Sequence, residues 1–157
     1  MRPFRPSMIV ALLAGLLCAA PAAADMSGPA QEPASPAPSR RPSAEGEFNR
    51  GVAAQKAKDW AAAAAAFRNA VALNPRYAEA WNGLGYALRN QGMYPDSIKA
   101  YDQALRLRPD FPEALEYLGE AYVRVRRLDD ARSVLERLKP LDAARAKELA
   151  ELIEKGT

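Results

Sequence analysis

Apolar positions in the middle of the chain recur at helical spacing in two consecutive segments. In each segment they fall three and four residues apart, which places them on one face of a helix. The sequence between the segments, Gln91 to Tyr94, contains Gly92, which suits a left-handed turn, and Pro109 ends the second segment because proline cannot continue a helix. The positions on this face are Trp81, Leu84, Gly85 and Leu88 in the first segment, and the small Ser97 with Tyr101 and Ala104 in the second.

The same pattern returns when the chain is shifted in either direction by a fixed step, the one that separates Gly51 from Gly85. We call this step the repeat period. A repeat of about 34 residues predicts a stack of helix pairs, in which each pair buries its apolar face against the next. The corresponding residues are Gly51, Gly85 and Gly119; Trp60, Tyr94 and Leu128; Ala63, Ser97 and Ala131; Phe67, Tyr101 and Leu135; and Pro75 and Pro109.

Three glycines stand at the same position of the first helix in each pair. A glycine inside a helix costs about 1 kcal/mol relative to alanine, so its recurrence indicates a local need for space. We expect Gly85 and the small Ser97 to let the two helices of the central pair approach closely, and Gly51 and Gly119 to act in the same way.

These residues resemble the signature of the tetratricopeptide repeat, and the central unit matches it at Trp81, Leu84, Gly85, Leu88, Ser97, Tyr101, Ala104 and Pro109. The resemblance implies an all-α, right-handed α-solenoid of three helix pairs with a capping helix at the carboxyl end. The first unit departs from the signature where Glu47, Arg50 and Ala54 replace large apolar residues, and the third where Leu138 replaces a small residue and Pro140 comes early.

The predicted boundaries follow from these landmarks. A final helix, from about Asp142 to Lys155, carries a narrow apolar stripe of Leu149, Leu152 and Ile153, which we interpret as the cap of the stack; the alternative is that the stripe contacts a second copy. The ranges are 44–77, 78–111 and a divergent 112–140 for the repeats, and 141–157 for the cap.

The part of the chain before residue 44 is expected to lie outside the repeats. Residues 1–24 combine two arginines, an apolar run and a small-residue stretch, which is the pattern of a secretory signal peptide. Cys18 raises the alternative of a lipid anchor, but Leu17 stands where a resemblance to lipoprotein signals would require a small residue. Residues 25–43 are rich in Pro, Ala and Ser and predict a disordered linker. The chain is therefore expected to be exported, to the periplasm of a bacterium or beyond it, with membrane attachment only through an uncleaved or lipidated signal.

Composition narrows the range of functions. The chain has no histidine and one cysteine, which excludes Ser-His-Asp and Cys-His catalysis and His/Cys zinc sites. Its net charge of +3 includes Arg2 and Arg5 of the expected signal, so nucleic-acid binding has little support. We therefore predict a non-enzymatic protein without a cofactor or metal.

The resemblance further implies that the first helix of each pair lines the concave face, where an extended peptide or protein segment would bind. Exposed tyrosines beside asparagines and mixed charges suit a peptide groove. The lysine/asparagine clamp for carboxylate tails is not expected, because Phe48, Val52 and Gly83 occupy its places. We expect a monomer; a self-associating or membrane-tethered envelope assembly factor and an accessory subunit of an envelope enzyme remain alternatives. The predicted groove residues are Phe48, Asn49, Val52, Lys56, Asn82, Tyr86, Arg89, Asn90, Glu116, Tyr117, Glu120 and Arg124.

Overall fold

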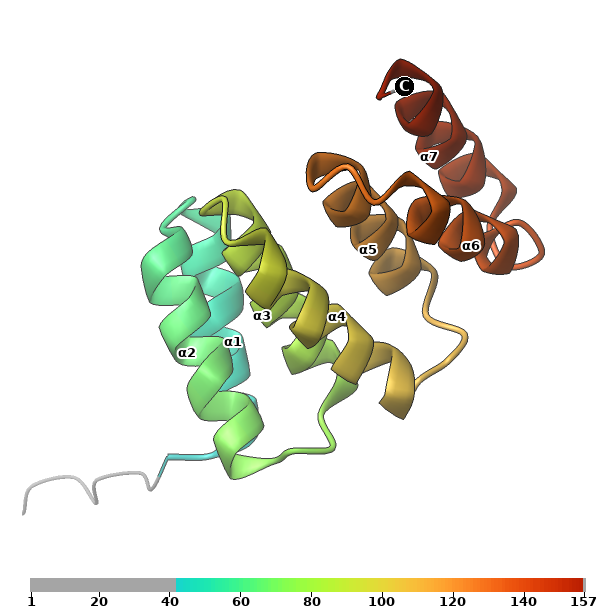
Figure 1. The fold of residues 1–157 in the computed structure, drawn as a ribbon. Helices are drawn as coiled ribbons and strands as arrows, with labels where there is room; N and C mark the ends of the chain where they lie inside the picture. Colours follow the sequence, from blue (N-terminus) through green and yellow to red (C-terminus); the bar gives the residue numbers. More distant parts are fainter. Residues whose placement is uncertain (1–41, 157) are drawn as a thin grey trace, which may run out of the picture. The chain divides into compact units, whose positions relative to one another are not determined.

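The computed structural model of the chain describes residues 42–156, so the predicted signal at 1–24 and nearly all of the linker at 25–43 lie outside the described residues. Helices α1 to α7 follow one another along the described part, which contains no β-strand (Figure 1). Their bounds are α1 Ala44–Lys56, α2 Trp60–Leu73, α3 Ala78–Asn90, α4 Tyr94–Leu107, α5 Pro112–Arg124, α6 Leu128–Leu138 and α7 Ala143–Lys155.

The repeat period is visible in these bounds. Helices α1, α3 and α5 start exactly one period apart, and so do α2, α4 and α6, whereas α7 starts before a full period has passed since the start of α5. Each helix contacts the next along the chain, and α1 contacts α3, α3 contacts α5 and α5 contacts α7. The predicted all-α stack of helix pairs is thus confirmed. We call the surface that α1, α3 and α5 form together the first-helix face.

The turn inside each pair has one conformation. Lys58, Gly92 and Arg126 stand one repeat period apart and have φ values of +58°, +76° and +62°. A residue in the left-handed conformation ends a helix while its last carbonyl groups still accept hydrogen bonds, and glycine adopts this conformation without steric cost. The prediction recognised only Gly92, because the other two turns place a long basic residue at a position that glycine favours.

Capping residues define the ends of the stack. The Ser43 hydroxyl accepts the Gly46 N–H at 3.0 Å at the start of α1. The Asp142 carboxylate accepts the N–H groups of Ala144 and Arg145 at 3.1 and 3.0 Å at the start of α7. These bonds satisfy donors that a helix start leaves unpaired, so both terminal helices begin where their capping side chains stand.

Aromatic rings occupy the space that the first two of the three glycines leave. A methyl group on Gly85 would lie 2.7 Å from the ring of Tyr101, and one on Gly51 would lie 2.7 Å from the ring of Phe67. The predicted close approach of α3 and α4 at Gly85 is present, and the side chain that fills the space is Tyr101. Ser97 is buried nearby on α4, and its hydroxyl donates to the Tyr94 carbonyl of its own helix at 3.0 Å.

The third glycine faces the last helix. A methyl group on Gly119 would lie 2.5 Å from Leu149 of α7, so the close approach there is between α5 and α7. Leu149 and Ile153 of the predicted stripe are buried, and Leu152 is half-buried. The stripe of α7 thus packs against the third pair of the same chain.

The remaining predicted packing residues lie where a stacked core requires them. Trp81 is half-buried and packs against both core clusters of the stack, and its indole N–H donates to the Pro75 carbonyl at 2.9 Å. Pro75 and Pro109 are exposed in the connections between pairs. The buried members are Ala63, Phe67, Leu84, Leu88, Tyr101, Ala131 and Leu135.

The first helix replaces an apolar contact with a buried polar one. Glu47 stands one repeat period before Trp81, and only 7 % of it is exposed. Its carboxylate accepts the Asn69 side-chain N–H at 3.0 Å and pairs with Arg50 at 2.7 Å. A hydrogen bond between α1 and α2 therefore takes the place of the expected large apolar residue.

Candidate functional site

The first-helix face contains an apolar hollow of about 240 Å³. Residues from α1, α2, α3 and α5 surround it, because the first helices lie side by side and Phe67 reaches between them from α2. Its apolar walls are rigid aromatic rings, which bury a guest side chain at little cost in conformational entropy. The lining residues are Phe48, Val52, Gln55, Phe67, Glu79, Asn82, Gly83, Tyr86, Phe111, Glu113 and Tyr117.

Asn82 is the polar feature of this hollow that lacks a partner. Its side-chain oxygen Oδ1 is buried and accepts no hydrogen bond from the described residues. An unsatisfied buried acceptor costs about 1–3 kcal/mol, so such groups usually have a partner. Because Oδ1 is covered, a donor that entered the hollow would reach it only after the Asn82 amide turned toward the hollow.

Two tyrosines at the edge of the hollow are packed against each other and against an arginine. The ring centroids of Tyr86 and Tyr117 are 5.1 Å apart, and the Arg89 guanidinium lies 5.1 and 4.9 Å from them. Arg89 also forms an ion pair with Glu120. Burial raises the pKa of the Tyr117 phenol, and the nearby Glu116 carboxylate acts in the same direction. The prediction of exposed tyrosines was therefore wrong: both are half-buried within a cation–π cluster.

A second hollow, of about 290 Å³, is polar. Its lining is Arg89, Asn90, Tyr94, Glu120 and Arg124, so Arg89 belongs both to this hollow and to the tyrosine cluster beside the first. Charged groups of both signs surround it, and the Arg89–Glu120 pair already neutralises one of each.

The predicted groove residues separate into those that line a hollow and those that do not. Asn49 and Lys56 are exposed on α1 and line neither hollow. The residues that do line one are Phe48, Val52, Asn82, Tyr86 and Tyr117 in the apolar hollow, and Arg89, Asn90, Glu120 and Arg124 in the polar one.

Glu116 was wrongly assigned to the groove. It is only 6 % exposed, and its carboxylate pairs with Arg145 of α7. The hydrogen bond from Arg145 to Glu116 is the main reason why the pKa of the Arg145 guanidinium is raised. Because α7 packs on α5, it covers the position at which the third pair would otherwise present a groove side chain.

Several lining residues of the apolar hollow were missed. Phe67 was identified only as a packing residue, and Phe111 stands in the connection before α5, outside the helix face that the pattern predicts. Gln55 lies in the last turn of α1, and Glu79 and Glu113 lie in the first turns of α3 and α5. Glu79 and Glu113 stand one repeat period apart, and this spacing was the one signal in the sequence that could have indicated their shared position.

Between residues 42 and 156 no cluster of three or more His, Cys, Asp or Glu residues is placed to hold a metal ion. In the same range no helix combines the length and the apolar character needed to cross a membrane.

Two family profiles match the chain inside this stack. One, described as "TPR repeat", matches residues 85–125, and the other, described as "Tetratricopeptide repeat", matches residues 48–96. Together they cover the residues from the middle of α1 to the end of α5, which include the first-helix face.

Solved structures of tetratricopeptide-repeat domains have the same fold. The TPR2B domain of yeast Sti1, solved in a complex named for pHsp70, superposes with a TM-score of 0.67 at 23% identity, over 72% of this chain and 94% of that chain. The TPR domain of Arabidopsis OM64 has a TM-score of 0.69 at 20% identity, over 73% of this chain and 96% of that one.

The curated relatives match only in part. A Drosophila melanogaster protein O-mannosyl-transferase, Tmtc3, is 28% identical over 87 residues, which are 55% of this chain and 9% of the relative. The chain thus spans less than a tenth of the length of that relative. Profiles, helix bounds and superpositions agree on one identity for the described stack: residues 48–125 of this chain are tetratricopeptide repeats.

Proposed function

We propose that the stack binds an extended segment of another protein on its first-helix face, without catalysis. In this proposal one apolar side chain of the segment enters the 240 Å³ hollow, and a backbone N–H beside it donates to Oδ1 of Asn82. The observation that carries the proposal is the combination of aromatic walls with a buried acceptor that has no donor.

The side chains that line this hollow favour an apolar ligand side chain over a carboxylate tail. Phe48, Val52 and Gly83 line the hollow, and none of them offers a cation or a hydrogen-bond donor from its side chain. The Sti1 domain shares the fold and was solved as a pHsp70 complex, which supports a protein segment as the class of ligand. The residues of this hollow, however, fit a leucine- or phenylalanine-sized side chain held by burial.

Asn82 is the sharpest test, because it contributes no hydrogen bond from Oδ1 to the free protein. The substitution N82A is expected to leave helicity and the melting temperature unchanged or slightly higher. Asn49 gives a matched control: it is also an asparagine on a first helix, but it is exposed and lines neither hollow. Alanine at Tyr86 or Tyr117 is less informative, since either change would also disrupt the cluster around Arg89.

The experiment has two steps. A photo-reactive phenylalanine analogue at Val52 cross-links the occupant of the hollow in cells, and mass spectrometry identifies the cross-linked segment. The segment is then synthesised and titrated against three proteins, the wild-type chain, N82A and N49A, by calorimetry. We expect N82A to weaken binding about five- to thirtyfold, the equivalent of about 1–2 kcal/mol, and N49A to have no effect. Equal affinities for all three proteins would refute the proposed site.

We further propose that the chain acts outside the cytoplasm, as the pattern of residues 1–24 predicts. Replacement of Leu12 and Leu13 by arginine would interrupt the apolar run of that segment. The full chain is expected in the exported fraction with a new amino terminus near Asp25, and the double variant in the cytoplasm at full length. Amino-terminal sequencing of both fractions decides this, and an unprocessed wild-type chain in the cytoplasm would contradict it.

A further inference from the structure

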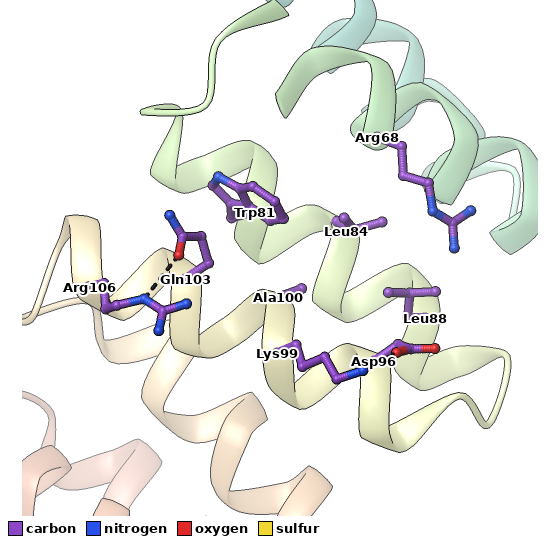
Figure 2. Close-up of a pocket in the computed structure, with 9 residues that line it drawn as sticks. All are labelled: Arg68, Trp81, Leu84, Leu88, Asp96, Lys99, Ala100, Gln103 and Arg106. Carbon is purple, nitrogen blue, oxygen red and sulfur yellow. Dashed lines mark hydrogen bonds and ion pairs between the residues drawn. The ribbon is translucent and has the colours of Figure 1, made fainter. Parts of the chain in front are cut away.

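A larger hollow lies on the opposite side of α3 from the apolar hollow, between the second helices of the first two pairs. It measures about 520 Å³, and no Cα atom of α2 lies within 8 Å of a Cα atom of α4. Figure 2 shows Arg68 entering from α2, the side chains of α4 entering from the other side, and Trp81, Leu84 and Leu88 of α3 between them. We call this the outer hollow.

The floor of the outer hollow is apolar. Leu84, Leu88 and Ala100 form it together with the half-buried Trp81, whose indole is held in place by its hydrogen bond to Pro75. Leu84, Leu88 and Ala100 are almost fully buried. The hollow above them still has a volume within the range of small-ligand sites, about 300–1,000 Å³.

The rim carries an excess of positive charge. Arg68 makes no side-chain hydrogen bond or ion pair with the described residues, and Arg106 donates to the neutral Gln103 at 2.9 Å. Lys99 pairs with Asp96 at 3.0 Å, so the one carboxylate of the lining is already neutralised. Two guanidinium groups, those of Arg68 and Arg106, therefore stand beside an apolar floor, and the carboxylate of the lining, Asp96, pairs with neither of them.

The site between α4 and α6, one repeat period further along the chain, can be compared with the outer hollow. One repeat period later, Tyr122 replaces Leu88, Val134 replaces Ala100 and Asp102 replaces Arg68. The larger Tyr122 and Val134 are buried, and the Arg127 guanidinium lies 4.6 Å from the Tyr122 ring. The corresponding site between α4 and α6 therefore carries bulkier side chains at two positions, a smaller one where Leu115 replaces Trp81, and a carboxylate in place of the Arg68 cation. Asp102 lies one turn before Arg106 on α4, but it does not line the outer hollow.

We propose that the outer hollow is a second docking site, for a short acidic protein segment that carries a large apolar side chain. The apolar side chain covers the Trp81–Leu84–Leu88 floor, and carboxylates of the segment pair with Arg68 and Arg106. This site is separate from the one on the first-helix face, so a single chain would bring two protein segments together on opposite sides of α3.

Trp81 supplies a direct readout of this site. The chain has two tryptophans, and W60F leaves Trp81 as the single tryptophan while keeping an aromatic ring beside Tyr86. The probe is the acetylated peptide SEELFEES, with SKKLFKKS and SEESSEES as charge-reversed and apolar-deleted probes. The expected result is a saturable change of Trp81 emission with SEELFEES alone, which weakens as salt rises because exposed charges are screened.

Charge-reversal variants test whether the change in Trp81 emission depends on Arg68 and Arg106. R68E/R106E is expected to weaken SEELFEES binding at least tenfold, about 1.4 kcal/mol, since both substituted residues are exposed and each attraction becomes a repulsion. R132E, an exposed reversal on α6 of an arginine that pairs with Asp129 outside the outer hollow, is the control for a single change of charge and should bind as W60F does. N82A should also bind normally, which separates this site from the one on the first-helix face.

Three results would overturn the proposal. One is the absence of a saturable Trp81 signal with SEELFEES; another is equal binding by R68E/R106E and R132E, with circular dichroism showing both folded. The third is self-association of the wild-type chain in light scattering that R68E/R106E abolishes, because the outer hollow would then be a contact between two copies.

Discussion

The tip of the Phe67 ring is confined between two helices, and this leads to a prediction about two glycines. A methyl group on Gly51 of α1 would lie 2.7 Å from ring atoms of Phe67, and one on Gly83 of α3 would lie 2.6 Å from them. Phe67 is 1% exposed, although its ring borders the apolar hollow. With one methyl group added, the ring can shift toward the glycine that remains. With both added, this shift is blocked.

The magnitudes can be worked out from this geometry. Overpacking a dense core costs about 1–3 kcal/mol, while replacing a helical glycine by alanine gains about 1 kcal/mol in helix propensity. Each of G51A and G83A should therefore lower the free energy of unfolding by about 0–2 kcal/mol. In G51A/G83A the ring cannot shift toward either glycine. The loss of unfolding free energy should then exceed the sum of the two single losses by about 1–2 kcal/mol, within the range found for residues that share a partner.

Gly85 makes the control possible. It also lies on α3, and a methyl group on it would come 2.7 Å from a ring, but that ring belongs to Tyr101. Since G51A and G85A act on different rings, the double variant G51A/G85A should be additive within about 0.5 kcal/mol. Urea unfolding followed by circular dichroism measures all five variants. The reasoning is refuted if G51A/G83A is as additive as G51A/G85A, or if its losses fall below the sum.

Three further predictions concern single contacts. R145M should lower the free energy of unfolding by about 2–3 kcal/mol in urea titrations, because it leaves the Glu116 carboxylate buried without its ion pair, and adding E116Q should recover part of the loss. K58G should raise stability by about 0.5 kcal/mol, since relief of the left-handed strain at Lys58 exceeds the entropic cost of glycine; a lower melting temperature would contradict this. The hydrogen bond from Asn69 lowers the pKa of Glu47 below its ordinary 4.5, so the ionised form contributes stability that is present above that pH and lost as the pH falls through the lowered value. E47Q should therefore flatten the acid side of a stability–pH profile, and an unchanged slope would show that Glu47 does not contribute.

The period in the sequence was sufficient to predict the helices, because each landmark residue serves the same packing purpose in every pair. It was less informative where a contact joins different pairs. Phe67 fits between Gly51 and Gly83, but Gly83 has no counterpart among the three aligned glycines, so its role could not be read from the alignment of units. The burial of Glu116 was missed for a similar reason: α7 starts out of step with the period, and the position that it covers depends on the irregular connection before it.

Charges on the candidate face show why residue types alone could not define the site. Arg89, Glu120, Tyr86 and Tyr117 would each suit a peptide groove, and a sequence pattern places them together. In the structure they contact one another, so the ion pair and the cation–π contacts that a ligand could make are already formed within the chain. A ligand that used Arg89 would have to break these contacts, whereas one that used the acceptor of Asn82 would break none from its Oδ1. The free energy available for binding therefore lies with the apolar hollow and its unpaired oxygen, although the arginine and the tyrosines are the more conspicuous residues in the sequence.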